Sequence, residues 1–365
     1  MKTVAIGDRL IGRTESPYIV AELSGNHRQS LAHAKKLIQA AAKAGVDAVK
    51  LQTYTPDTLT LPIRNPLFKL NDGLWSGHYL YDLYAEAMTP WEWHSELANY
   101  AQELGIQLFS TPFDATAVDY LEAQVQPAVY KIASFELNHL PLLRKVGALG
   151  KPVILSTGMA ALGEIELAVG TLREAGSGPI ILLKCVSAYP ADPADFNLKG
   201  MVTLAEHFDC LVGVSDHSLG SEICHAAVAL GACVIEKHLV LDRGDGSVDS
   251  GFSIEPEEFA QLVASVRRLH LGLGSGDLAD VPPDRAQQRF RRSIFACAAI
   301  DKGEEFSENN LKIVRPSDGL EPAHWQAVLG KIATRSIAAG EPLSWDMVEG
   351  HPCSLVSKSK SKRTK

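Results

Sequence analysis

The sequence predicts an α/β fold, a (β/α)8 TIM barrel followed by a small β-rich domain. The first observation is a series of eight short apolar runs rich in Val, Ile and Leu, which is typical of buried parallel strands. The second is that segments with apolar residues three and four positions apart, the pattern of helices, lie between these runs. Eight strand–helix units in one series fit a barrel better than an open sheet. The eight runs are YIVAEL (18–23), AVKLQ (48–52), QLFST (107–111), VYKIAS (129–134), PVILST (152–157), IILLKC (180–185), LVGVSD (211–216) and CVIEKH (233–238).

The other elements of the barrel follow in order along the chain. The opening TVAIGDRLIG predicts a hairpin that closes the bottom of the barrel. Helical patterns cover 31–45, 91–105 and 162–176, and each ends in Gly, a common helix stop. The last barrel helix is expected over 255–274. The connection at 56–90, after the second strand, is far longer than a usual β/α loop, and long loops on that face tend to carry substrate contacts.

The chain changes character after the barrel, which we expect to occupy 1–274. Residues 275–288 are rich in Pro, Gly and Asp and predict a linker. Residues 289–351 contain short apolar runs, a KGE turn and no long helix until about 322, so they predict a separate small β-rich domain. A core of about 60 residues is marginal alone and would gain from docking or dimerisation. Residues 352–365 predict a basic disordered tail.

Composition argues against two classes of partner. The formal net charge of the 365 residues is −8, and it would be −13 without the five positive charges of the last eight residues, KSKSKRTK. An acidic body argues against a nucleic-acid-binding surface. No apolar run approaches the ~20 residues that span a bilayer, and the N-terminus lacks the apolar core of a signal peptide. The six cysteines form no C-x-x-C pair, so we expect neither a zinc knuckle nor a disulfide framework, and a cytoplasmic protein.

Two histidines at neighbouring strand ends predict a metal site. Active sites of TIM barrels form at the C-terminal ends of the strands; His217 follows the seventh apolar run and His238 ends the eighth. Imidazole ligands favour Mn, Fe, Co or Zn over Mg or Ca. Two histidines leave positions open for water and substrate oxygens, as a Lewis acid requires. The alternative is that both are ordinary polar residues of loops.

Lysines and hydroxyls at other strand ends predict a phosphate site. Lys50 and Lys131 lie within strands and would point into the barrel mouth, where an unpaired ammonium is costly to bury without an anion. Hydroxyls supply short donors to such an anion, although each alone could equally cap a strand end. No G-x-x-x-x-G-K-[ST] loop is present, so a nucleotide P-loop is not expected. The hydroxyl residues are Thr111, Ser134, Ser156 and Ser215.

Three carboxylates form a candidate acid–base set. Glu22 ends the first predicted strand, Glu136 follows the fourth and Asp249 follows the eighth. Any of them could orient a sugar hydroxyl or move a proton. Each could equally be a structural partner of a lysine or a metal.

The motifs that carry these residues resemble those of the sialic acid synthase (NeuB-like) family over nearly the whole chain. The segment FRRSIFACAAIDKGEEFSENNLKIVRP (290–316) resembles the antifreeze-like (SAF) domain that ends these proteins. Several stretches, including YKIASFE and VDSGFS, look like the branch that makes pseudaminic acid. The motifs, which stand in the family's order, are AELSGNH (21–27), DAVKLQTYTPDTLT (47–60), STPFD (110–114), LSTGM (155–159), SDH (215–217) and EKH (236–238).

This resemblance implies a reaction. Phosphoenolpyruvate would condense with 2,4-diacetamido-2,4,6-trideoxy-L-altrose to give pseudaminic acid and phosphate. His217 and His238 would bind a divalent cation (Mn²⁺, Mg²⁺ or Co²⁺), and Glu22 is the candidate for the proton of the attacking water. Arg315 would reach the sugar in the partner subunit of a domain-swapped homodimer. The residues implied for phosphoenolpyruvate are Lys50, Thr111, Lys131, Ser134, Ser156 and Ser215, and those implied near the sugar or the reacting carbons are Glu22, Gln52, Glu136, Tyr189 and Asp249.

Three alternatives remain open from the sequence. The sugar could be that of an N-acetylneuraminate or legionaminic acid synthase, and Ser187 stands where sialic acid synthases tend to have Asn beside the sugar. The chain could be a Schiff-base aldolase that uses Lys131 or Lys184. It could also be a non-catalytic sugar-binding protein that works through its terminal domain.

Overall fold

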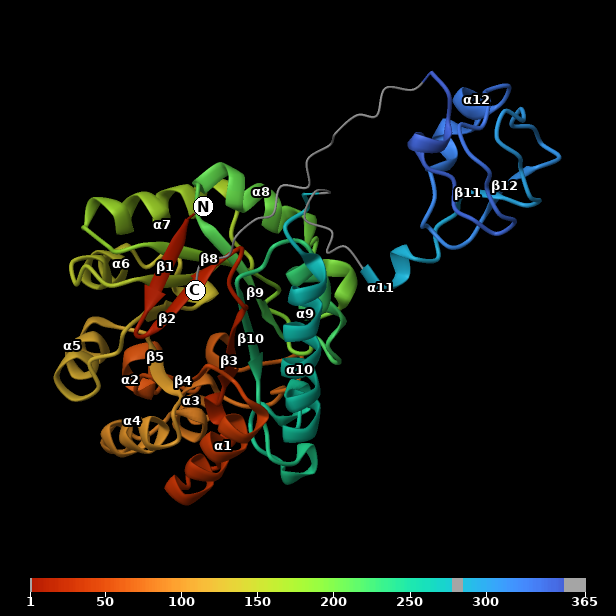
Figure 1. The fold of residues 1–365 in the computed structure, drawn as a ribbon. Helices are drawn as coiled ribbons and strands as arrows, with labels where there is room; N and C mark the ends of the chain where they lie inside the picture. The colour runs from red at the N-terminus through yellow and green to blue at the C-terminus, as the bar shows by residue number, and fades with distance from the viewer. Residues whose placement is uncertain (1, 278–284, 351–365) are drawn as a thin grey trace. The chain divides into compact units, whose positions relative to one another are not determined.

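The computed structural model describes residues 2–277 and 285–350, and the chain forms two units, Met1–Gly276 and Asp277–Lys365 (Figure 1). Each unit is described by itself. Within the described residues, no helix combines the length and the apolar composition that a membrane span needs. Predictions for residues 278–284, for 351 and for the basic tail at 352–365 fall outside the described residues.

Eight parallel strands form the barrel of the first unit, as the sequence predicts. Their hydrogen-bonded order is β5-β4-β3-β10-β9-β8-β7-β6, and β5 also lies beside β6, which brings the two ends of the sheet together. The last strand pairs with the first, so that His238 lies opposite Glu22. The strands are β3 (Tyr18–Glu22), β4 (Ala48–Thr53), β5 (Gln107–Pro112), β6 (Tyr130–Ile132), β7 (Val153–Ser156), β8 (Ile180–Cys185), β9 (Leu211–Asp216) and β10 (Val234–His238).

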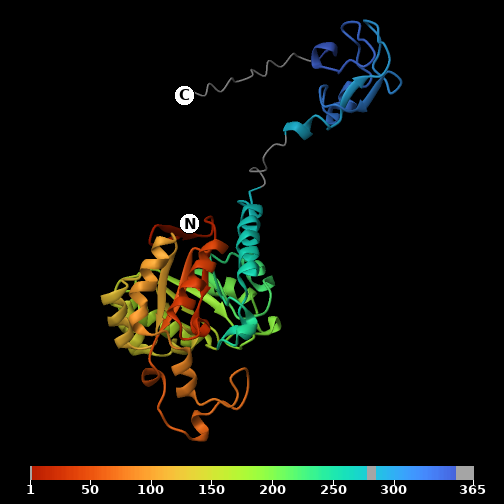
Figure 2. The same cartoon turned by 90° about the horizontal axis from the view of Figure 1, so that it is seen from below.

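Helices surround the strands (Figures 1 and 2). The first begins where the Ser30 side chain accepts a hydrogen bond from the backbone N–H of His33, and it ends at Gly45 with φ of 85°. Its apolar face, with Leu37 and Ile38, packs into the main core. The barrel helices are α1 (Leu31–Ala44), α4 (His94–Glu103), α5 (Ala115–Gln124), α6 (Leu140–Gly147), α7 (Leu162–Glu174), α8 (Lys199–Phe208), α9 (Glu222–Ala229) and α10 (Pro256–Leu273).

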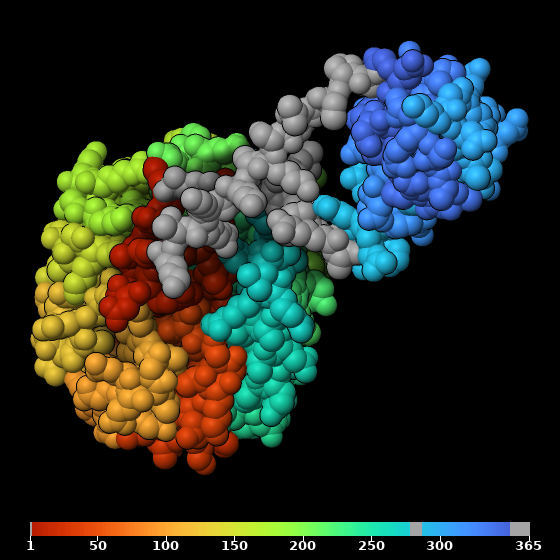
Figure 3. Space-filling model, viewed as in Figure 1, coloured from red at the N-terminus to blue at the C-terminus, as the bar shows by residue number. Residues whose placement is uncertain are grey.

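A hairpin closes one end of the barrel. Strands β1 (Thr3–Ile6) and β2 (Arg9–Gly12) pair antiparallel, and Ile6 and Ile11 share a buried cluster with Tyr18 and Phe109 of the barrel strands. The side chain of Gln107 donates from Nε2 to the carbonyl of Ile6 at 2.9 Å. In the space-filling view the red atoms of this segment lie inside the ring of helices (Figure 3). The predicted hairpin is therefore confirmed.

The long connection after β4 extends from the opposite end of the barrel. In Figure 2 this orange segment projects away from the hairpin. It carries α2 (Pro56–Leu59), the 3-10 helix η2 (Pro66–Phe68), α3 (Leu80–Ala87) and the 3-10 helix η3 (Trp91–Trp93). The first unit also contains the 3-10 helices η1 (Ser24–His27), η4 (Ser134–Glu136), η5 (Pro193–Asp195), η6 (Arg243–Asp245) and η7 (Ser250–Phe252).

The second unit has its own small core. Strands β11 (Ser293–Ala296) and β12 (Leu311–Val314) pair antiparallel, and isolated bridges add further strand-like contacts. Ile294, Phe306, Val328 and Met347 are buried together. The other elements are α11 (Arg285–Gln288), η9 (Pro322–His324), α12 (Trp325–Val328) and η10 (Trp345–Met347).

Candidate active site

The polar residues predicted in the first unit lie at the carboxyl ends of the barrel strands or in the segments that follow them. Parallel strands place these ends on one side of the barrel. Arg315 lies in the second unit, directly after β12, so its predicted role stays a prediction. The others are Glu22 (β3), Lys50 and Gln52 (β4), Thr111 (β5), Lys131 (β6), Ser134 and Glu136 (η4), Ser156 (β7), Tyr189 (after β8), Ser215 (β9), His217 (after β9), His238 (β10) and Asp249 (before η7).

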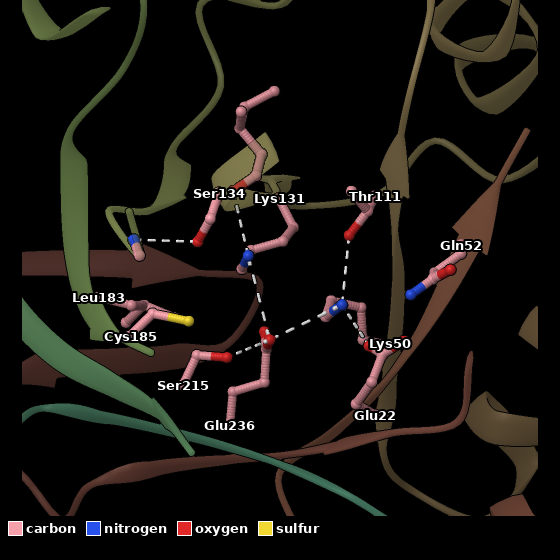
Figure 4. A network of polar contacts seen from close by, with 12 residues as sticks. Glu22, Lys50, Gln52, Thr111, Lys131, Ser134, Leu183, Cys185, Ser215 and Glu236 are labelled. Atoms are coloured by element: carbon pink, nitrogen blue, oxygen red, sulfur yellow. Dashed lines mark hydrogen bonds and ion pairs between the residues drawn. The ribbon is translucent and has the colours of Figure 1, made fainter. Parts of the chain in front are cut away.

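Two lysines and two glutamates form a buried charge network inside the barrel (Figure 4). The Nζ of Lys50 pairs with Oε2 of Glu22 and lies 3.8 Å from Oε1 of Glu236. The Nζ of Lys131 lies 4.0 Å from the same Glu236 oxygen. All four side chains are at least nine-tenths buried, so two ammonium groups and two carboxylates face one another away from water.

The network supplies negative charge beside both lysines. We expected an anion there because an unpaired ammonium is costly to bury, and Glu22 and Glu236 lie beside the two Nζ atoms. Glu236 received no role from the sequence. A signal was present, because Glu236 and His238 are two residues apart and so face the same side of β10.

Burial and mutual attraction set the pKa values of the four groups. Burial acts to lower the pKa of Lys50, but Glu22 and Glu236 outweigh it, so that pKa is raised. Burial raises the pKa of Glu22, the charge of Lys50 opposes this rise, and Glu236 adds to it. Burial also acts to raise the pKa of Glu236, but Lys131 and Lys50 outweigh it, so that pKa is lowered. Burial lowers the pKa of Lys131. Glu22 is therefore the carboxyl of the network that takes up a proton more readily.

Hydroxyl groups lie at the same strand ends as the two ammonium groups. The Nζ of Lys50 donates to Oγ1 of Thr111 at 3.2 Å, and Oγ of Ser215 donates to Glu236 at 3.0 Å. Ser134 accepts a hydrogen bond from the backbone N–H of Gly158 at 3.0 Å. The Oγ of Ser156 is buried without a hydrogen-bond partner among the described residues. A hydroxyl in that state can still donate to an anionic oxygen.

The two predicted metal ligands lie side by side. The ring centroids of His217 and His238 are 5.2 Å apart. Nδ1 of His217 lies 2.8 Å from the carbonyl of Val186, which must accept from it, so Nε2 carries the lone pair when the ring is neutral. Burial acts to lower the pKa of His217, but Cys185 and the Val186 carbonyl outweigh it, so that pKa is raised. Nδ1 of His238 is buried and has no partner among the described residues. Burial and the neighbouring His217 lower the pKa of His238, which favours the neutral, metal-binding form of that ring.

These histidines fit a divalent metal that also binds other oxygens. In the described parts of the chain, no group of three or more His, Cys, Asp or Glu side chains is arranged to hold a metal ion. Two imidazoles with free ring nitrogens therefore supply only part of a coordination shell, and water or substrate oxygens would complete it.

Two further carboxyls lie near the same strand ends. Burial raises the pKa of Glu136 to about 7, and one of its oxygens is buried without a hydrogen-bond partner among the described residues. Burial raises the pKa of Asp249 to about 6, and its Oδ2 accepts from the backbone N–H of Gly25 at 3.2 Å. Gln52 donates from Nε2 to Oγ of Ser24 at 2.8 Å, and Ser24 in turn donates to Glu22. This set can accept hydrogen bonds from sugar hydroxyls or exchange protons near neutral pH.

An aromatic cluster borders the histidines. The ring of Tyr189 lies 4.5 Å from that of His217, and the ring of Phe252 lies 4.8 Å from that of His238. Trp75, from the long connection, lies 5.5 Å from Tyr189 and 6.3 Å from Phe252, as centroid distances. Sequence reasoning found Tyr189 through the family resemblance and missed the other two, since nothing in the local pattern joins residue 75 to residue 252.

The opposite face of β10 carries a second buried ion pair. Nζ of Lys237 lies 2.7 Å from Oδ2 of Asp216 and donates to the carbonyl of Ser218, also at 2.7 Å. The Sγ of Cys224 in α9 donates to the same carboxylate at 3.2 Å. This pair joins β10, which ends in His238, to β9, which His217 directly follows.

Comparison with known families and proteins adds to this geometry. Residues 37–278 match the model of the NeuB family, and residues 291–349 match the model of the SAF domain. The chain is 47% identical to a pseudaminic acid synthase of Campylobacter jejuni subsp. jejuni, over 89% of this chain and 95% of that protein. It is 38% identical to an N,N'-diacetyllegionaminic acid synthase of the same subspecies, over 88% of this chain and 97% of that protein. A crystal structure of the N-acetylneuraminic acid synthetase of Leptospira borgpetersenii in complex with citrate matches with a TM-score of 0.70 and 34% identity, over 79% of this chain and 94% of that one.

Proposed function

The chain belongs to the NeuB family, and from this membership we propose that it is a pseudaminic acid synthase. It would condense phosphoenolpyruvate with 2,4-diacetamido-2,4,6-trideoxy-L-altrose, releasing phosphate. The observation that carries this choice is the greater likeness to a pseudaminic acid synthase than to a legionaminic acid synthase, over nearly equal shares of the chain. We propose that it works in the cytoplasm as a homodimer.

Phosphoenolpyruvate would bind beside the buried lysines. Lys50 and Lys131 supply positive charge, and the unpartnered hydroxyl of Ser156 can donate to a phosphate oxygen. Glu236 keeps both ammonium groups in place between turnovers. The remaining hydroxyls for the phosphate are those of Thr111, Ser134 and Ser215.

The histidines would hold the metal. A divalent cation bound by His217 and His238 supplies Lewis acidity to the aldehyde oxygen of the open-chain sugar. The two neighbouring rings would hold this cation, and the ring of Tyr189 packs against that of His217. Gln52, Glu136 and Asp249 would hold the hydroxyl and acetamido groups of the sugar.

The reaction would then proceed in three steps: formation of the C–C bond, addition of water and loss of phosphate. Carbon 3 of phosphoenolpyruvate forms the new bond to the aldehyde carbon, which leaves positive charge at carbon 2. Water adds at carbon 2, and Glu22 accepts its proton, as a carboxylate whose pKa burial raises. The tetrahedral intermediate then breaks the C–O bond to phosphate as its carbon-2 hydroxyl loses a proton and becomes the ketone, and Lys50 and Lys131 stabilise the departing charge. Of the two protons released at carbon 2, one goes to the alkoxide at the former aldehyde carbon and the other to the departing phosphate.

A substrate panel tests the proposal. We expect the purified protein with phosphoenolpyruvate to release phosphate with a higher kcat/KM for the diacetamido trideoxy altrose than for N-acetylmannosamine or the legionaminic precursor. Preference for either competitor would refute the choice of sugar and leave the reaction class intact.

Removal of metal tests the proposed cation against the rival Schiff-base aldolase. We expect a chelator to abolish phosphate release, and Mn²⁺ or Co²⁺ to restore it to the unmodified protein but not to His217→Ala or His238→Ala. The rival predicts the opposite: activity survives the chelator, and borohydride links substrate covalently to Lys131 or Lys184.

A further inference from the structure

We propose that Trp75 is a specificity-determining residue whose indole ring packs against the 6-methyl group of the sugar. This inference rests on the proposed function, because it concerns the sugar of that reaction. Trp75 lies in the long connection after β4, and the structure brings it beside residues of the loop after β10.

The tip of the connection is seated on the loop after β10. The indole N–H of Trp75 donates to the carbonyl of Val248 at 2.9 Å, across 173 positions of sequence. Beside it, Leu74 lies over Gly251, where a Cβ would meet the Leu74 side chain at 3.2 Å. The absence of a side chain at Gly251 therefore leaves the room that Leu74 occupies. Trp75 is half-buried, and its position is fixed by its own hydrogen bond to Val248 and by the contact of the adjacent Leu74 with Gly251.

The indole ring extends the surface that borders the histidines. Trp75 contacts Tyr189 and Phe252, and these two rings contact His217 and His238. A sugar whose aldehyde lies at the histidines would run outward along this cluster. The end of the sugar chain away from the aldehyde is then the part nearest Trp75.

The chemistry of the ring favours a methyl group over a hydroxyl at that end. The one polar atom of the indole is already bonded to Val248, so the ring offers only its apolar faces. A hydroxyl placed against such a face loses water and gains no hydrogen bond, whereas a methyl group gains apolar contact. The proposed substrate has a methyl group at carbon 6.

A pair of sugars that differ in one atom tests this inference. The probes are 2,4-diacetamido-2,4,6-trideoxy-L-altrose and its 6-hydroxy counterpart, each assayed by phosphate release with phosphoenolpyruvate. We expect the unmodified protein to prefer the 6-deoxy sugar by about tenfold or more in kcat/KM, the scale of one buried methyl contact. Trp75→Ala should bring the ratio to about 1 by loss of activity on the 6-deoxy sugar, with the KM for phosphoenolpyruvate unchanged. Trp75→Phe should keep most of the preference, because a phenyl face remains.

Trp91 provides a matched control. It is also half-buried, donates its indole N–H to a backbone carbonyl (Tyr54, 2.9 Å) and packs on an aromatic ring, that of Tyr120. Trp91→Phe should leave the ratio unchanged. An equal loss on both sugars in Trp75→Ala, or a Phe variant that behaves like Ala, would overturn the inference, since Trp75 would then only seat the loop. No turnover of either sugar by the unmodified protein would instead refute the proposed function.

Discussion

At the scale of single residues, the barrel places carboxyl groups of different proton affinity at the carboxyl ends of its strands. Glu236 sits near two ammonium groups and its pKa is lowered, whereas burial raises the pKa of Glu22 and of Glu136. The same side chain therefore serves as a fixed negative charge in one place and as a proton acceptor in another. Environment, which no single position of the sequence reveals, decides between these roles.

Glu136 makes this difference measurable as stability. Its pKa rises from 4.5 to about 7 on folding, so between these values the folded state holds a proton that the unfolded state has lost. The stability of the folded barrel should therefore fall as pH rises through this window, and Glu136→Gln should remove that fall. We expect the variant to gain up to about 3 kcal/mol in free energy of unfolding relative to the unmodified protein between pH 4.5 and pH 7, measured by denaturant titration.

Glu257→Gln, at an exposed position of α10, is the control for this measurement. It should change the free energy of unfolding only slightly, because the side chain is exposed. A Glu136→Gln variant whose gain did not depend on pH would show that the carboxyl titrates alike in both states.

At the scale of elements, β9 and β10 position the two histidines and are joined on their outer face by a charge pair. Lys237 and Asp216 are fully buried there, and Ser218 and Cys224 complete their hydrogen bonds. This contact fixes the turn after β9 against the strand that ends in His238. The pairing of the two strands also places Glu236 opposite Ser215.

Lys237→Met should be strongly destabilising, because it leaves Asp216 charged and buried without its partner. We expect a loss of about 3–5 kcal/mol in free energy of unfolding, with part of it recovered in the double variant that also carries Asp216→Asn. Lys145→Met breaks an exposed pair with Asp119 and should cost at most about 1 kcal/mol. Equal losses in the two lysine variants would contradict a structural role for the buried pair.

Most elements could be predicted because buried parallel strands are recognisable in local sequence. The eight apolar runs became β3 to β10, and the opening segment became the β1–β2 hairpin. The contacts within the candidate site were harder to predict from the sequence. The partnership of Lys50 with Glu236 depends on the pairing of the last strand with the first, and Trp75 reaches Val248 through a folded loop. Neither contact leaves a period or spacing in the sequence that could reveal it.

At the scale of the whole molecule, the barrel and the SAF domain are separate units with separate cores. We propose that Arg315 of one subunit serves the site of its partner. A mixture of Arg315→Ala and His238→Ala chains should then regain phosphate release in heterodimers, because one of the two sites has both an intact barrel and an intact arginine.

A mixture of His217→Ala and His238→Ala chains is the control for this experiment. Both changes lie in the barrel, so no heterodimer of that mixture holds a complete site and no recovery is expected. Absence of recovery in the first mixture, with subunit exchange demonstrated by mass spectrometry, would exclude the shared arginine.

The hairpin at the bottom of the barrel also has a kinetic consequence. Because Ile6 and Ile11 fill the end of the barrel where the strands begin, both substrates must enter from the end where the strands finish. Lys50 and Glu236 precede the ends of their strands by three and two residues, so a ligand held by the lysines lies beneath one held at His238. Turnover should therefore be ordered, with phosphoenolpyruvate entering before the sugar and phosphate departing after the nine-carbon product. Phosphate is accordingly expected to inhibit competitively against phosphoenolpyruvate and noncompetitively against the sugar.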